Sequence, residues 1–182
     1  MLKLKNIVLG SKSPRRQELL KYIISDFEVI TKDIDEIVPD SIEPKDAAKY
    51  LSQLKANAYQ GEIENGNTII TSDTIVLLDN IILGKPKDKH HAFDMLISLS
   101  GKSHDVITGV CIKNKDKEVL FDETTKVYFK TLTDEEINYY IDTYQPFDKA
   151  GAYGIQEWIG MIGVEKIDGC YYNVMGLPLV SL

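Results

Sequence analysis

The sequence predicts an α/β fold with a mixed sheet and flanking helices, formed by residues 1–182 as a single domain. Two observations support this fold class. Apolar stretches typical of strands alternate along the chain with stretches of helical periodicity. No linker rich in Gly, Ser or Pro divides the chain, and its length is within the range of one domain with a substantial core. Spacing alone leaves the strand order open.

The N-terminal half combines strand and helix signals. Short apolar runs bounded by turn residues predict strands, whereas apolar stripes at helical spacing predict helices. The predicted extended segments are 3–9, 27–31, 68–78 and 81–83, and the predicted helices are 14–24 and 44–59. Pro44 occupies a favoured first helical position, and Asp79-Asn80 forms a tight turn.

The C-terminal half predicts two helices that flank a long hairpin. Asp88 is the expected N-cap of a helix that stops at Gly101. Two long strands, 103–113 and 118–130, follow, joined by a polar turn. Thr133 and Glu136 have the spacing of a capping box, and we expect their helix to end near Tyr144. The last stretch, 150–182, is rich in Gly and aromatic residues, a composition that predicts loop and strand.

Composition excludes several classes of function. The formal net charge of −7 argues against stable nucleic-acid binding, which favours a basic surface. No run of about 18 apolar residues occurs, so we expect no membrane span, and the N-terminus lacks the apolar core of a signal peptide. Cys111 and Cys170 form no CxxC pair, which favours a reduced, cytoplasmic setting.

The turn from Gly10 to Arg16 is the first candidate site. Ser11 belongs to a small-residue turn, and Ser13 is the expected N-cap of the following helix. The first helical turn then carries Arg15 and Arg16, although the helix dipole favours acidic residues there. Backbone amides at a helix N-terminus and two guanidinium groups would form a phosphate-binding cradle. The alternative is a solvated basic turn, and the motif is not a P-loop.

Lys55 and Asp73 are candidates because each is a charged residue in an apolar context. Lys55 falls within the apolar stripe of predicted helix 44–59, where it could point toward a substrate or lie along the edge of the core. Asp73 interrupts an apolar strand, which is unusual for a carboxylate. It could bind a metal or accept a proton from water. A hydrogen-bonded structural aspartate is the alternative.

Three further positions carry chemistry in loops. Lys85 lies between Gly84 and Pro86, which would hold it in place, although a polar turn is the simpler interpretation. The Gln156 amide could accept from N3–H and donate to O4 of uracil or thymine, and a flipped amide could match cytosine instead. Glu36 could add a metal ligand or belong to an acidic surface loop.

Taken together, five segments resemble the Maf family, also called the septum formation protein Maf family. In chain order they are residues 9–20 (LGSKSPRRQELL), 72–76 (SDTIV), 84–88 (GKPKD), 148–156 (DKAGAYGIQ) and 176–179 (GLPL). Each motif alone is modest support, whereas five in the expected order, spanning almost the whole chain, are highly specific. The resemblance implies a fold like that of inosine triphosphate pyrophosphatases, with a substrate cleft between two lobes.

The resemblance also implies an activity. Family members hydrolyse nucleoside triphosphates to the monophosphate and pyrophosphate with a divalent cation, here Mg²⁺ or Mn²⁺, and are usually homodimers. The family's proton acceptor matches Asp73. Its catalytically important basic residues match Arg15, Arg16, Lys55 and Lys85, and its positions linked to substrate choice match Arg15, Thr74 and Gln156. We expect Ser11 and Ser13 to bind substrate, and Asp73 and Glu36 to hold the metal.

The string at 149–156 resembles the dTTP/UTP pyrophosphatase subgroup and differs from the subgroup that prefers 7-methyl-GTP. We therefore expect hydrolysis of dTTP and UTP, with 5-modified pyrimidine nucleotides as further candidates. The rival functions are removal of the γ phosphate alone, nucleotide binding that regulates cell division without turnover, and a pyrophosphatase that prefers 7-methyl-GTP. The chain departs from the family at 157–160 (EWIG), where a small, Gly-rich continuation is expected. It also ends at Leu182, before the final helix that members usually have.

Overall fold

The computed structural model describes residues 6–182, and its centre is one seven-stranded sheet of order β2-β1-β3-β5-β6-β7, with β4 paired to β3. The strands are β1 (Ile7–Leu9), β2 (Glu28–Val29), β3 (Thr68–Leu78), β4 (Ile81–Leu83), β5 (Ser103–Lys113), β6 (Glu118–Phe129) and β7 (Val164–Asp168). β1 runs parallel to β2 and β3, whereas the other pairings are antiparallel. The predicted mixed sheet is therefore confirmed. The first residues of predicted strand 3–9 lie outside the described part.

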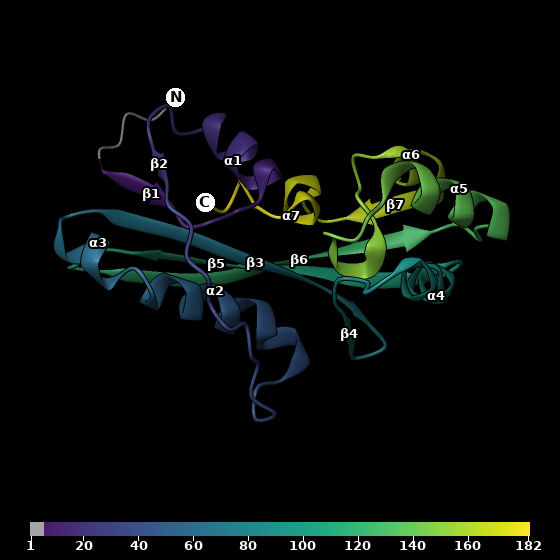
Figure 1. The fold of residues 1–182 in the computed structure, drawn as a ribbon, viewed down its shortest axis with the longest axis horizontal. Helices are drawn as coiled ribbons and strands as arrows, with labels where there is room; N and C mark the ends of the chain where they lie inside the picture. Colours follow the sequence, from purple (N-terminus) through teal and green to yellow (C-terminus); the bar gives the residue numbers. More distant parts are fainter. Residues whose placement is uncertain (1–5) are drawn as a thin grey trace.

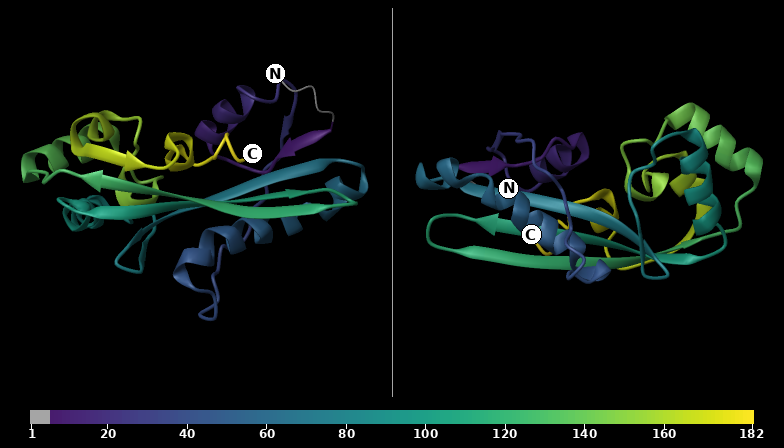
Figure 2. Two further views of the ribbon diagram at one scale, coloured as in Figure 1. Left: turned by 180° about the vertical axis from the view of Figure 1, so that it is seen from behind. Right: turned by 60° about the horizontal axis from the view of Figure 1, so that its bottom comes forward.

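Helices cover both faces of the long strands (Figure 1). They are α1 (Pro14–Lys21), α2 (Ala47–Asn57), α3 (Gln60–Glu64), α4 (Lys89–Leu99), α5 (Asp134–Tyr144), α6 (Trp158–Gly163) and α7 (Tyr171–Met175), with 3₁₀ turns at Pro44–Asp46 and Ala150–Ala152. α2 lies along one face of β3 and β5, while α1 and α7 lie on the opposite side, as Figure 2 shows from two directions. Within residues 6–182, no helix is both long and apolar enough to cross a membrane.

The structure confirms the long elements and corrects several boundaries. The predicted helix 14–24 ends at Lys21, although Ile24 is still buried. The predicted helix 44–59 opens as a 3₁₀ turn and ends at Asn57, and α3 follows it unpredicted. The stretch 150–182 contains α6 and α7 as well as the expected strand. Helices this short are marginal by themselves and depend on tertiary packing, which leaves little local signal.

The apolar core is divided along the sheet. One cluster packs α4, α5 and α6 against the β4 end of β3, with members such as Val76, Leu96 and Ile137. A second packs α1 and the C-terminal segment against β1, with Leu9, Leu20 and Leu177. The long strands β3 and β5 contribute to both clusters. The middle of β3 therefore lies between two separately packed halves.

Gly109 allows α2 to lie directly on the sheet. It pairs with Asp73 across β5 and β3, and a Cβ atom there would lie 2.3 Å from the carbonyl oxygen of Ala48 in α2. The neighbouring Thr71 hydroxyl donates to the carbonyl of Ser52 in α2, with 2.7 Å between the oxygens. Close backbone contact and this hydrogen bond together set the height of α2 above the sheet.

We expect Gly109→Ala to lower the free energy of unfolding by about 1–3 kcal/mol, the usual cost of forcing an extra methyl group into a packed core. Urea unfolding followed by circular dichroism measures this value. Gly61→Ala is the control, because a Cβ atom there meets nothing within 4 Å. Equal stability of the Gly109→Ala variant and the native chain would contradict the proposed close packing.

Candidate active site

The site lies where β3 has an open edge. On this edge β1 pairs with β3 only as far as Ile70, and β4 begins to pair at Val76. Between these points, within the described residues, β3 has no strand partner on this side. Two adjoining cavities open here, a larger one of about 420 Å³ and a smaller one of about 370 Å³. Both are lined by Ser13, Arg15, Arg16, Glu36, Lys55, Lys85 and Asp148.

Asp73 and Lys55 form an ion pair at the floor of the site. Asp73 is buried in β3, with 8% of its surface exposed, and its Oδ1 contacts the Lys55 ammonium. Glu36 contacts the same ammonium, with 3.0 Å between Oε1 and Nζ. The structure therefore brings together three residues that the sequence singled out, with one cation between two carboxylates.

Arg15 and Arg16 are adjacent in α1 but have different surroundings. Arg15 is partly exposed, and its Nη1 lies 3.1 Å from Oδ2 of Asp148. Arg16 donates from Nε to the Gly176 carbonyl at 2.8 Å and from Nη1 to the Ser72 carbonyl at 2.7 Å. Its Nη2 donates to the Thr74 hydroxyl at 2.9 Å, and burial lowers the pKa of Arg16. Protein acceptors thus engage every nitrogen of the Arg16 guanidinium.

Thr74 belongs to a directed chain of hydrogen bonds. Its hydroxyl accepts from Arg16 and lies 2.8 Å from the Thr108 hydroxyl, which itself donates to the Asn173 carbonyl. Because a carbonyl can only accept, Thr74 must donate to Thr108. Neither Thr108 nor Asn173 is distinguished by any local pattern in the sequence. A buried threonine opposite Thr74 in the neighbouring strand is visible only once the register of β3 and β5 is known.

The serines of the N-terminal turn shape its backbone. The Ser13 hydroxyl accepts from the backbone N–H of Arg16, as expected of an N-cap, and the Ser11 hydroxyl accepts from the N–H of Ser13. Ser11 is buried and lines the smaller cavity. Both serines therefore support the turn that presents Arg15.

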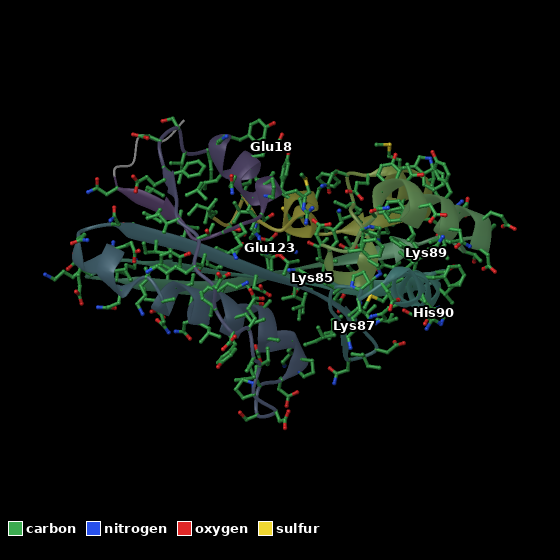
Figure 3. The ribbon with its side chains drawn as sticks, in the orientation of Figure 1. Glu18, Lys85, Lys87, Lys89, His90 and Glu123 are labelled. Atoms are coloured by element: carbon green, nitrogen blue, oxygen red, sulfur yellow. The ribbon has the colours of Figure 1, made fainter. Side chains whose placement is uncertain are left out.

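Lys85, which follows β4, and Gln156, which precedes α6, also line the larger cavity. Lys85 lines both cavities and lies near the middle of the molecule (Figure 3), whereas Gln156 lines only the larger one. The loop that carries Lys85 is hydrogen-bonded to the segment 148–156, because the Gly151 N–H donates to the Gly84 carbonyl at 3.1 Å. The larger cavity also has apolar walls, including Val76, Leu83 and Ile155.

His104, for which the sequence indicated no catalytic role, supports Tyr153 in the wall of the larger cavity. Its Nε2 lies 2.8 Å from the Tyr153 hydroxyl, and both rings pack edge to face with Phe129. Burial lowers the pKa of His104 to about 4, so the ring is neutral at neutral pH. The histidine is a structural partner of the site wall.

The carboxylates present fit a divalent cation that is shared with a substrate. Within residues 6–182, no group of three or more His, Cys, Asp and Glu side chains is arranged to hold a metal ion. Mg²⁺ in phosphate-processing sites, however, is typically held by one or two carboxylates together with substrate phosphates and water. Asp73 and Glu36, which meet at Lys55, supply such a pair.

Comparison with known proteins places the chain in a family. The family model described as "Maf-like protein" matches residues 6–182. The chain belongs to the Maf-like proteins. A relative from Flavobacterium psychrophilum, named dTTP/UTP pyrophosphatase, is 52% identical over 94% of this chain and 88% of its own length. A relative from Parabacteroides distasonis with the same name is 52% identical over 100% of this chain and 94% of its own.

A solved structure supports the fold of this Maf-like protein. The Ham1 protein of Staphylococcus aureus superposes with a TM-score of 0.51 at 16% identity, covering 69% of this chain and 72% of the Ham1 chain. At this identity the likeness concerns the fold alone. It confirms the α/β class with a mixed sheet that the sequence predicted.

We expect Arg16→Lys to lower the free energy of unfolding by about 1–3 kcal/mol, because the single nitrogen of an ammonium cannot reach the acceptors that three separate guanidinium nitrogens contact, which leaves buried acceptors unpaired. Arg15→Lys is the matched control, since its partly exposed side chain has one ion pair and its loss should change stability little. Urea unfolding of both variants measures the difference. Equal destabilisation by the two substitutions would contradict the anchoring role of Arg16.

Proposed function

We propose that this Maf-like protein hydrolyses nucleoside triphosphates between the α and β phosphates, with dTTP and UTP as preferred substrates. The observation that carries the proposal is a buried carboxylate, Asp73, which lines the larger cavity and pairs with Lys55, a cation that lines both cavities. The printed name of the relatives at about half identity agrees with it. Substrates with a 5-modified pyrimidine belong to the same proposed class.

The smaller cavity suits the polyphosphate. It is lined by the turn from Gly10 to Arg16, at the N-terminus of α1, and by Lys32 and Lys85. Backbone N–H groups at a helix N-terminus and nearby cations favour phosphate. A triphosphate carries roughly four negative charges, which Arg15, Lys55 and Lys85 would largely offset. We assign the β and γ phosphates to this cavity.

The larger cavity suits the nucleoside. Its apolar walls can cover a base, and Gln156 offers one amide with both an acceptor and a donor. That pair matches N3–H and O4 of uracil and thymine. Because a flipped amide would match cytosine, the base preference depends on how the loop around Gln156 holds the amide.

The proposed chemistry takes place where the cavities join. Asp73 accepts a proton from a water molecule that attacks the α phosphorus, and pyrophosphate leaves toward the smaller cavity. Lys55 holds the Asp73 carboxylate in place and balances charge on the phosphates. Asp73 and Glu36 are the residues that would hold Mg²⁺ or Mn²⁺, and the ion when bound supplies further charge neutralisation. Arg16 positions Ser72 and Thr74 beside the reacting group.

We propose that the chain acts as one domain, as a homodimer, in the cytoplasm. Both cysteines are free, and burial raises the pKa of the Cys111 thiol to about 11, which makes this thiol unreactive. Two free cysteines are compatible with a reducing compartment.

Product analysis tests the reaction. With Mg²⁺ or Mn²⁺, we expect dTTP and UTP to yield the monophosphate and pyrophosphate faster than CTP, ATP, GTP or 7-methyl-GTP do, as resolved by ion-exchange chromatography. Diphosphate with free phosphate would instead show a γ-phosphatase. Tight nucleotide binding without turnover would favour a regulator, and preference for 7-methyl-GTP would overturn the role given to Gln156.

We expect Asp73→Asn to reduce kcat on UTP by about 100-fold or more, the usual contribution of a general base, while the chain still folds. Steady-state release of pyrophosphate measures the loss, and circular dichroism checks the fold. Asp122→Asn is the control, because Asp122 pairs with Lys49 on the surface of β6, away from both cavities. Full activity of Asp73→Asn would end the assignment of Asp73 as proton acceptor.

A further inference from the structure

We propose that Glu157 is a positioning residue for substrate choice, which holds the segment 153–156 in the shape that presents the Gln156 amide to the base. The inference rests on the proposed function, because it gives a role to a residue beside the proposed base site. Glu157 is also where the sequence departs from the pattern expected of the family. Its surroundings give a physical reason for an acidic side chain at this position.

The Glu157 carboxylate has a buried partner for each oxygen. Oε2 accepts from the Tyr140 hydroxyl, and Oε1 lies 3.1 Å from the ammonium of Lys149. The Lys149 side chain is only 9% exposed and that of Glu157 is 19% exposed. A buried ammonium is strongly disfavoured without a counter-charge. Glu157 therefore cannot be replaced by a neutral residue without weakening the support of Lys149.

Tyr140 connects the Glu157 carboxylate to the backbone of the segment 153–156, here called the base loop. Its ring is fully buried in α5, and its hydroxyl accepts from the Gly154 N–H at 3.0 Å while it donates to Glu157. Burial, followed by the hydrogen bond to Glu157, raises the pKa of Tyr140, so the hydroxyl keeps the proton that it donates. The backbone two residues before Gln156 is thereby attached to α5.

The Glu157 side chain also packs on the loop directly. A Cβ atom on Gly154 would lie 2.7 Å from Cδ and 2.8 Å from Oε2 of Glu157, so the carboxylate occupies the space that a side chain there would need. In α6, which follows Glu157, a Cβ atom on Gly160 would lie 1.9 Å from the carbonyl oxygen of Ile155. The segment 153–156 is thus enclosed by Glu157 and by the backbone of α6.

The same network reaches the phosphate end of the site. The Lys149 ammonium lies 2.7 Å from Oδ1 of Asp148, whose Oδ2 lies 3.1 Å from Nη1 of Arg15. Asp148 lines both cavities. One continuous chain of contacts therefore runs from the base loop to the turn proposed to bind phosphate. Its members are Tyr140, Glu157, Lys149, Asp148 and Arg15. Loss of Glu157 should act first at the base end, where its contacts are direct.

The first test replaces Glu157 with Gln, which keeps the size of the side chain and removes its charge. We expect KM for UTP to rise about 10-fold, the effect of one charge-assisted contact, with kcat changed less than about 3-fold. We also expect the ratio of kcat/KM for UTP over ATP to fall. Glu165→Gln, at an exposed position of β7, is the control and should leave both values unchanged.

A merely structural role predicts a different pattern, in which kcat falls equally for all nucleotides because fewer molecules are folded, while KM and the UTP preference stay the same. That result would overturn the inference. Calorimetric titration with UMP gives a readout that does not depend on turnover. Weaker UMP binding by Glu157→Gln than by the native chain supports the inference even if the proposed reaction fails, and equal binding, or no binding to either, rejects it.

The second test uses the contact between Gly154 and Glu157. We expect Gly154→Ala to raise KM for UTP in the native background and to do so much less in a Glu157→Ala background, because removal of the carboxylate frees the space for the methyl group. Equal effects of Gly154→Ala in the two backgrounds would show that Glu157 does not hold the loop. Because this comparison uses differences between variants, it is insensitive to the absolute rate.

Discussion

The ion pair between Asp73 and Lys55 is the interaction on which the site depends. A carboxylate in a central strand is costly to bury without a cation at contact distance, so the lysine must approach β3 closely. Lys55 is carried by α2, and α2 can lie low enough only because Gly109 has no side chain between the helix and the sheet. The bond from Thr71 to Ser52 holds the helix at that height. The need to pair the buried Asp73 carboxylate with Lys55 thus explains why position 109, in the neighbouring strand β5, is a glycine.

The open edge of β3 explains why this pair faces a cavity. β1 pairs with β3 only up to Ile70, and the pairing with β4 starts only at Val76. Between these residues, side chains from neighbouring segments contact this edge of β3, and no strand pairs with it within the described residues. Arg16 fills part of the gap by binding the backbone at Ser72 and Gly176 together with the Thr74 hydroxyl. Successive residues of a helix point about 100° apart, so Arg15, one position earlier, points away from these acceptors and pairs with Asp148 at the cavities.

The segment 148–157 joins the two halves of the molecule around the site. Its first residue contacts Arg15, and its last contacts Tyr140 in α5. The carbonyl of Gly84 also accepts from its backbone at Gly151, so the loop that carries Lys85 is attached to it. A substrate that spans both cavities would touch residues whose positions are set by this one segment. In the proposed function, the contacts to phosphate and to base would therefore both depend on the position of this segment.

The sequence by itself determined the elements with strong local signals. Strands 68–78 and 103–113 and the caps at Ser13, Asp88 and Thr133 are as predicted, because alternation and capping act between residues close in the chain. Local chemistry also identified Asp73 and Lys55 as unusual charges. Only the tertiary structure decided that Arg16 is bound by protein acceptors and that Glu157 supports Lys149. The bond from Arg16 to Gly176 joins residues 160 positions apart, and no local pattern records a pairing at that separation.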